Sequence, residues 1–121
     1  MNNDISIQQR TKRFAIRVIS AYVELNKKPF DDAGKVLSKQ FLRCGTSMGA
    51  NCAEAQFAQS RADFLSKYSI ASKEASECRY WMEIMIESNF ISQIKFQEMQ
   101  SELYRIIKIL VSTTKKLKVN K

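Results

Sequence analysis

The sequence contains no histidine, one proline and three glycines in 121 residues. The missing histidine excludes Ser–His and Cys–His nucleophiles, most zinc sites and the Glu-x-x-His ligands of di-iron bundles. So few glycines and prolines leave few means of making tight turns, which favours long helices with few connections. No apolar run approaches the ~18 residues of a membrane span. We therefore expect one all-α domain over residues 1–121, with no membrane partner, metal or cofactor.

The cysteine content indicates the cellular compartment, and the net charge indicates the class of binding partner. The three cysteines are an odd number, and no apolar signal core precedes them. Reduced thiols are the default in the cytosol, so we expect a cytoplasmic protein. The net charge is +8. A small basic protein suggests a polyanionic partner, nucleic acid first and an anionic membrane surface second.

Turn and capping signals divide the chain into four helices, at about residues 5–27, 32–58, 61–87 and 93–118. Pro29 ends the first helix, and Asp31 or Asp32 can cap the second. Ser60 and Ser92 can cap the third and fourth. Because connections this short make neighbouring helices antiparallel, the predicted fold is an up-down-up-down four-helix bundle.

Apolar spacing supports the bundle and leaves surplus apolar surface. The third range carries a heptad seam of the kind that bundles bury, formed by Phe64, Tyr68, Ala71, Ala75, Cys78, Met82 and Met85. Ile70 and Trp81 lie off that seam, beside Glu74 and Glu77. Because an exposed Trp and Ile are unusual on a small monomer, we expect a subunit interface there. The alternative is a thick bundle that covers these residues itself.

The stretch RCGTSMGANCAEAQ, residues 43–56, has two glycines four positions apart. A phosphate-binding loop needs G-x-x-x-x-G-K-[ST] after a strand, and this chain has GTSMG with no following Lys. Inside a helix, Gly45, Gly49 and Ala53 instead form a ridge of small residues. Because each helical glycine costs about 1 kcal/mol relative to alanine, we expect close helix packing along this ridge.

A second face of the same helix is polar. If this face meets the third helix, Arg43 can pair with a carboxylate, as a buried charge requires. The predicted polar seam and subunit interface comprises Arg43, Ser47, Asn51, Glu54, Ile70, Glu74, Glu77 and Trp81.

The run FLRCGTSMGANCAEAQFAQSRADFLSKYSIASKEASECRYWMEI resembles the signature of the 23S rRNA intervening-sequence proteins, a family of four-helix bundles. The matching elements are Arg43, the S-x-G-A-N-x-A-E-A run at residues 47–55, Asp63-Phe64, and I-A-x-x-E-A-x-E-x-x-Y-W at residues 70–81. The resemblance implies a bacterial cytosolic protein that forms a homopentameric ring. The chain is also similar to the accessory variability protein of diversity-generating retroelements, which implies work with a reverse transcriptase and nucleic acid.

Basic residues concentrate at one predicted pole of the bundle. In an up-down-up-down bundle, the start of the first helix, the junction of the second and third, and the end of the fourth share one pole. We assign to it Arg10, Lys12, Arg13, Arg17, Arg61, Lys67, Lys115, Lys116, Lys118 and Lys121. Only Asp4 and Asp63 oppose these ten bases, so the pole would carry the net charge of +8. Cations near a helix C-terminus also complement the macrodipole, but Arg10–Arg17 lie near an N-terminus, where positive charge is unfavourable.

Three functional hypotheses remain open at this point. The first is a non-enzymatic oligomer that binds structured RNA, or other nucleic acid, through the basic pole. The second is a scaffold for a protein partner such as a polymerase or reverse transcriptase. The third is a Mg²⁺-dependent nucleotide hydrolase that uses Glu74 and Glu77, although hard cations want several oxygen ligands and only Glu54 is a plausible addition.

Overall fold

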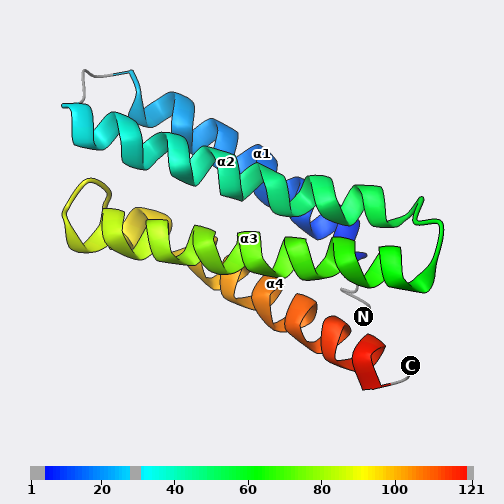
Figure 1. The fold of residues 1–121 in the computed structure, drawn as a ribbon. Helices are drawn as coiled ribbons and strands as arrows, with labels where there is room; N and C mark the ends of the chain where they lie inside the picture. The colour runs from blue at the N-terminus through cyan, green and yellow to red at the C-terminus, as the bar shows by residue number, and fades with distance from the viewer. Residues whose placement is uncertain (1–4, 28–30, 120–121) are drawn as a thin grey trace.

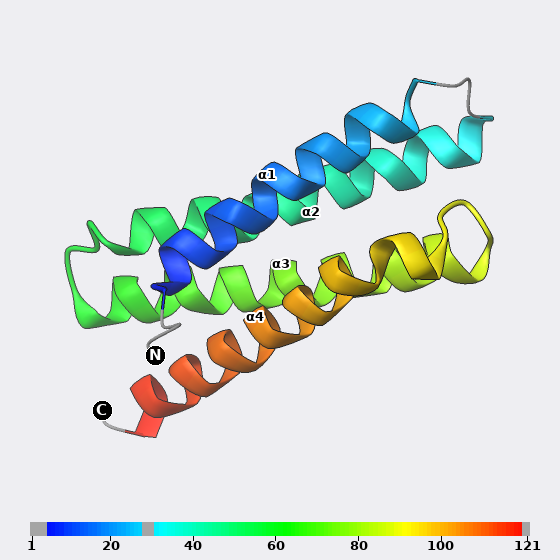
Figure 2. The same cartoon turned by 180° about the vertical axis from the view of Figure 1, so that it is seen from behind.

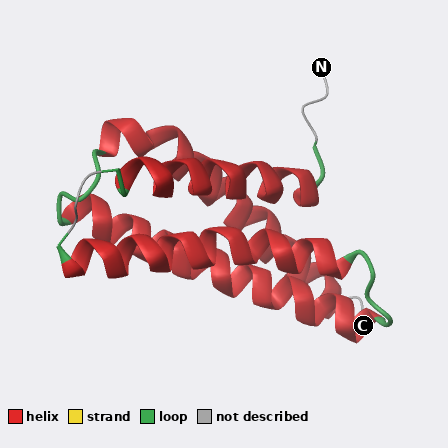
Figure 3. Cartoon of the chain, turned by 90° about the horizontal axis from the view of Figure 1, so that it is seen from above, coloured by secondary structure: helices red, strands yellow, loops and turns green. Residues whose placement is uncertain are grey.

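A computed structural model of the chain describes residues 5–27 and 31–119, and its regular elements are all helices (Figure 3). These are α1 (Ile7–Leu25), α2 (Asp32–Ala55), α3 (Arg61–Glu87) and α4 (Gln93–Val119). The prediction of an all-α chain with four helices is confirmed. Within the described ranges, no helix is both long and apolar enough to cross a membrane.

Three helix starts are fixed by side-chain caps. Ser6 Oγ accepts from the Gln9 amide at 3.1 Å, and Asp31 Oδ1 accepts from the Gly34 amide at 2.8 Å. Ser60 Oγ accepts from the Asp63 amide at 3.0 Å. Each cap satisfies one of the amides that a helix start leaves without a partner. Pro29, the predicted terminator of the first helix, lies outside the described residues.

The end of α2 is a correction to the sequence interpretation, which extended this helix to residue 58. The helix ends at Ala55, because the next three amides turn back more tightly. Gln56, Phe57 and Ala58 donate to the carbonyls of Ala53, Glu54 and Ala55, at 3.2, 3.0 and 3.2 Å. Bonds to the third residue back are the 3₁₀ geometry that often closes a helix.

The four helices pack side by side along their lengths (Figures 1 and 2). The end of α1, the start of α2 and the α3–α4 connection lie at one end of the molecule, on the left in Figure 1. The α2–α3 connection, the start of α1 and the end of α4 lie at the other end. Helices consecutive in sequence are packed neighbours, and α1 also contacts α4, less extensively than any of those pairs.

The core is built from the apolar seams of all four helices. The seam predicted on the third helix is buried from Tyr68 to Met85, and Phe64 is partly buried beside it. The remaining buried hydrophobic residues are Phe14, Val18, Phe41, Cys44, Met48, Cys52, Ala55, Ile91, Met99, Leu103, Ile106 and Leu110. Burying one large apolar side chain stabilises the fold by about 1.5–3 kcal/mol.

Gly45 and Gly49 of α2 face α1. A Cβ atom on Gly45 would lie 2.8 Å from both methyl carbons of Val18, and one on Gly49 would lie 3.2 Å from the Thr11 carbonyl oxygen. Any larger residue would therefore push α1 away at Gly45. Ala53, the third residue of the ridge, is exposed and lines a groove between the two helices.

Candidate nucleic-acid interface

One end of the bundle brings together three segments that are distant in sequence, and we call it the basic end. It is formed by the start of α1, the α2–α3 connection with the start of α3, and the end of α4 (Figure 2). Gln8 Nε2 of α1 donates to Tyr68 Oη of α3 at 2.9 Å. Arg61 Nη2 of α3 donates to the Leu117 carbonyl of α4 at 3.2 Å. These two bonds hold the three helix ends together.

Most of the predicted basic residues at this end are free to meet a ligand. Lys12, Arg13, Lys115, Lys116 and Lys118 are exposed, and none of them forms an ion pair within the described residues. Arg61 is also exposed, and its guanidinium donates to a neutral carbonyl rather than to an acid. Lys121, also assigned to this end, lies outside the described residues. The free cations come from α1, α3 and α4 and therefore surround the basic end.

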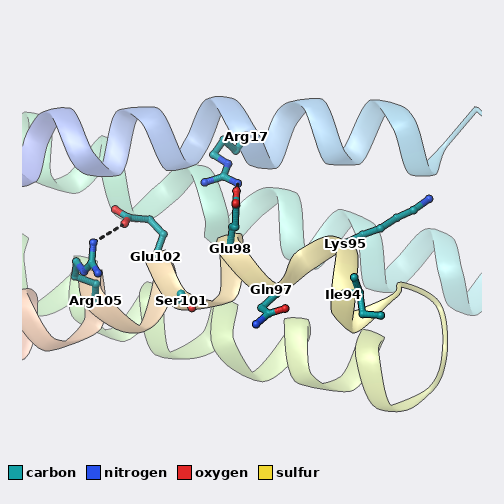
Figure 4. A pocket seen from close by; sticks show the side chains of 8 residues that line it. All are labelled: Arg17, Ile94, Lys95, Gln97, Glu98, Ser101, Glu102 and Arg105. Atoms are coloured by element: carbon teal, nitrogen blue, oxygen red, sulfur yellow. Dashed lines mark hydrogen bonds and ion pairs between the residues drawn. The ribbon is translucent and has the colours of Figure 1, made fainter.

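Two arginines assigned to the pole are tied to acids of α4, which corrects the predicted charge count. Arg10 Nη1 lies 3.0 Å from Glu102 Oε2, and the two side chains are only 13% and 21% exposed. Arg17 Nη2 lies 3.5 Å from Glu98 Oε2, near the start of α4 (Figure 4). Since Arg17 also lies past the midpoint of α1 (Ile7–Leu25), it is not at the pole.

Lys67 is the third of the bases assigned to the pole that pairs with an acid. Its Nζ lies 2.9 Å from Glu54 Oε1, and the Glu54 carboxylate raises the pKa of the Lys67 ammonium. Glu54, Glu98 and Glu102 were not among the two acids counted at the pole. The basic end is therefore less positive than the count of ten against two indicates, and its free charge is the exposed set described above.

A polar cluster joins α2 to α3 away from the basic end. Arg43 Nη1 donates to Glu74 Oε1 at 2.8 Å, and Arg43 Nη2 donates to Glu77 Oε2. Trp81 Nε1 donates to the same Glu77 oxygen at 3.1 Å. The Trp81 and Arg43 hydrogen bonds lower the pKa of the Glu77 carboxyl, and Glu77 raises that of Arg43. Arg43 thus links two carboxylates of the neighbouring helix.

In the rest of the predicted polar seam, Glu54 pairs with Lys67 of α3, whereas Ser47 and Asn51 bond to each other within α2. Asn51 Nδ2 donates to the Ser47 carbonyl at 3.0 Å, within α2. Ile70 is exposed, as predicted for an interface, but Trp81 is partly buried against the core. The bundle therefore covers much of Trp81 itself, which was the alternative interpretation of this face.

The carboxylates that suggested a magnesium site already have a cation beside them. Arg43 contacts both Glu74 and Glu77, while Glu54 pairs with Lys67. Within residues 5–27 and 31–119, no three His, Cys, Asp or Glu side chains are grouped so that they could hold a metal ion. The contacts of these acids are those of ion pairs between helices.

Two grooves flank α1. The groove against α4 has a volume of about 550 Å³ and alternates basic and acidic side chains, among them Arg17, Glu98 and Arg105 (Figure 4). The groove against α2 has about 600 Å³ and runs from the basic end over the small residues Gly49, Ala50 and Ala53. Its polar lining consists of Ser6, Gln8, Gln9, Lys12, Thr46 and Gln56.

One exposed residue at the basic end was missed by the sequence interpretation. Phe57 lies in the α2–α3 connection and is 84% exposed. Because the second helix was extended to residue 58, this aromatic was assumed to lie inside it. What could have indicated its exposure is its position between the two helices. Phe57 comes two residues after the last buried residue of α2 and three before the Ser60 cap.

Comparison with known proteins places the chain in a family. Residues 3–112 match the family of 23S rRNA-intervening sequence proteins. A crystal structure of a protein of unknown function from the S23 ribosomal protein family of Bacteroides thetaiotaomicron is similar over 91% of this chain and 99% of its own. The two share 40% identity with a TM-score of 0.81. No curated protein matches the sequence. The chain belongs to the 23S rRNA-intervening sequence protein family.

Proposed function

We propose that this protein is a non-enzymatic, oligomeric, cytoplasmic protein that binds structured RNA through its basic end. The observation that carries the proposal is the set of exposed cations without acidic partners on α1, α3 and α4 at that end. Lys and Arg neutralise phosphates and release counterions, which is the main source of sequence-independent affinity for nucleic acid. The family name, 23S rRNA-intervening sequence protein, supports RNA rather than DNA.

A purely local explanation accounts for only part of this charge. Lys116 and Lys118 lie in the last turn of α4, where cations stabilise the helix dipole. Lys12 and Arg13 lie in the second turn of α1, close to the positive end of its dipole, where they gain nothing from it. Their exposure without an acidic partner therefore supports a ligand that supplies negative charge.

Self-assembly is the second part of the proposal. We take the bundle as up-down-up-down and place several copies in a ring, with a pentamer as the expected number. Ile16, Ile19 and Val23 form an exposed stripe on α1, at 55%, 47% and 54% exposure, and Ile70 is exposed on α3. In a ring the basic ends would lie on one side, so that their fields add. Light scattering counts the subunits, and a monomer would contradict this part.

The RNA proposal is tested by comparing two variants that carry the same change in charge at opposite ends of the bundle. The variant K115E/K116E/K118E reverses three free cations at the basic end, and K35E/K39E/K95E reverses three exposed lysines near the other. We expect the first variant to lose RNA affinity and to reduce the salt slope by about one for each phosphate that is no longer neutralised. Binding by the wild type should fall steeply between about 50 and 200 mM salt. Equal losses in both variants would show that the basic end is not the binding surface.

A scaffold for a polymerase or reverse transcriptase is the second candidate function. The α1 stripe favours it if the chain is monomeric, because a protein partner would then cover Ile16, Ile19 and Val23. A partner recovered with the tagged protein after nuclease treatment, and absent with I19E, would support the scaffold over direct RNA binding.

A further inference from the structure

Phe57 is the most exposed aromatic residue within the described ranges, and it lies at the basic end. The residue is 84% exposed, while the residue two positions before it, Ala55, is buried in the core. A large apolar side chain in this position gains nothing from the fold, because it contributes almost no burial. Its position therefore calls for an explanation other than core packing.

The backbone that carries Phe57 is held in place. The Phe57 amide donates to the Glu54 carbonyl at 3.0 Å, within a run of three such bonds that closes α2. Four residues further on, Arg61 is anchored to the end of α4 by its bond to the Leu117 carbonyl. The ring is thus presented from a hydrogen-bonded turn between two helices, four residues before the exposed Arg61.

The neighbouring groove offers the other groups that an unpaired nucleotide requires. Gln56, the residue before Phe57, lines the α1–α2 groove together with Gln8, Gln9 and Lys12. Glutamine amides donate to and accept from base edges, and a lysine contacts phosphate. Four small residues, Ala15, Gly49, Ala50 and Ala53, also line this groove, whose volume is about 600 Å³.

We propose that Phe57 is a stacking platform for an unpaired base, so that this end binds a single-stranded segment of a structured RNA, such as a loop or a bulge. The inference rests on the proposed RNA-binding function and specifies the part of the RNA that is bound. In a duplex the base faces are already stacked, so an exposed ring adds nothing to phosphate contacts along it. Unpaired bases stack on aromatic side chains, and each such contact contributes about 1–3 kcal/mol.

The test compares single-stranded and duplex RNA with variants of this one residue. The probes are a twelve-nucleotide unstructured RNA and a blunt duplex of the same length, each titrated at several salt concentrations. We expect F57A to weaken single-strand binding roughly tenfold or more, with duplex binding changed less than about twofold. Tyrosine in F57Y should restore single-strand affinity, and leucine in F57L should not, because it keeps apolar bulk without a π face.

The salt dependence separates this contact from the charge contacts. Since stacking releases no counterions, F57A should leave the slope of log Kd against log salt unchanged, in contrast to K115E/K116E/K118E. Equal losses for duplex and single strand, or full affinity in F57L, would overturn the inference while leaving the proposed RNA binding intact. A changed subunit number in F57A would also overturn it, because the ring would then belong to an interface between copies. If the wild type binds neither probe, the proposed function fails first, and the inference with it.

Discussion

Gly45 shows how one residue sets the distance between two helices. A methyl group there would lie 2.8 Å from the two γ carbons of Val18, which is fully buried, so that Val18 or α1 would have to shift. Overpacking of this kind costs about 1–3 kcal/mol, while replacing a helical glycine by alanine returns about 1 kcal/mol. We expect G45A to lose about 1 kcal/mol of unfolding free energy in urea.

Gly49 supplies the matched control for this prediction. A Cβ atom there would lie 3.2 Å from a backbone oxygen, which is tight but tolerable, so G49A should be close to neutral. The double variant V18A/G45A should be more stable than the sum of the two single losses predicts, because V18A removes the methyl groups that clash. Strict additivity would contradict a direct contact between the two positions.

Cys52 gives a residue-scale prediction about alkaline pH. Burial raises the pKa of its thiol from 9.0 to about 11, against a smaller opposite effect of the Thr11 hydroxyl. Above pH 9 the unfolded chain loses this proton while the folded chain keeps it. Stability from this group is therefore complete below pH 9 and lost as pH rises toward 11, at up to about 1.4 kcal/mol per pH unit.

The variant C52A isolates this titration from that of the lysines and tyrosines. Denaturant unfolding of both proteins between pH 8 and pH 11 should show the wild type losing stability more steeply than C52A above pH 9. Parallel curves would mean that the Cys52 thiol titrates normally in the folded protein.

At the scale of the helix, local sequence signals were sufficient to predict where helices begin and which of their residues are buried. Ser60 and Asp31 cap helices at the predicted places, and the seam spacing on α3 identified residues that are buried. Capping and amphipathic spacing depend on residues within a turn or two, so the chain shows them directly. The early end of α2 was missed because QFAQ contains no glycine or proline to mark a stop, and so the exposure of Phe57 was missed as well.

The Arg43 cluster is the main polar connection between α2 and α3, and its strength can be measured. Arg43 contacts Glu77, which also accepts from Trp81, but the Arg43 side chain is 47% exposed. Exposed pairs contribute little, so a double-mutant cycle of R43M and E77Q should give a coupling energy of about 0.5–1 kcal/mol. The control cycle is K27M with E24Q, an exposed i,i+3 pair at the end of α1 that should give about 0.2–0.5 kcal/mol.

The two cycles distinguish a connection between helices from a pair on one helix. Coupling that is no larger for Arg43 than for Lys27 would show that the cluster does not hold α2 against α3. A larger value supports its role in fixing how the two helices are aligned. Urea unfolding of each single and double variant gives both coupling energies.

For the whole molecule, the sequence could not predict how α4 is aligned against α1. Arg10 and Glu102 are 92 positions apart, and their pairing depends on how the fourth helix returns to the first. No periodic pattern encodes that alignment, so Arg10 was assigned to the RNA-binding surface. The same holds for Arg17, which pairs with Glu98.

The two ion pairs between α1 and α4 should differ sharply in their effect on stability. Arg10 is 13% exposed, its Nε atom has no hydrogen-bond partner, and Glu102 supplies its only opposite charge within the described residues. E102Q would leave a mostly buried cation without an opposite charge, which we expect to cost about 1–3 kcal/mol. E98Q removes the same charge from an exposed pair and should cost under about 0.5 kcal/mol. Urea unfolding compares them, and hydrogen exchange should show α1 amides losing protection in E102Q alone. Equal effects would mean that Arg10 reaches water once Glu102 is neutral, and Arg10 would then count again among the free cations of the basic end.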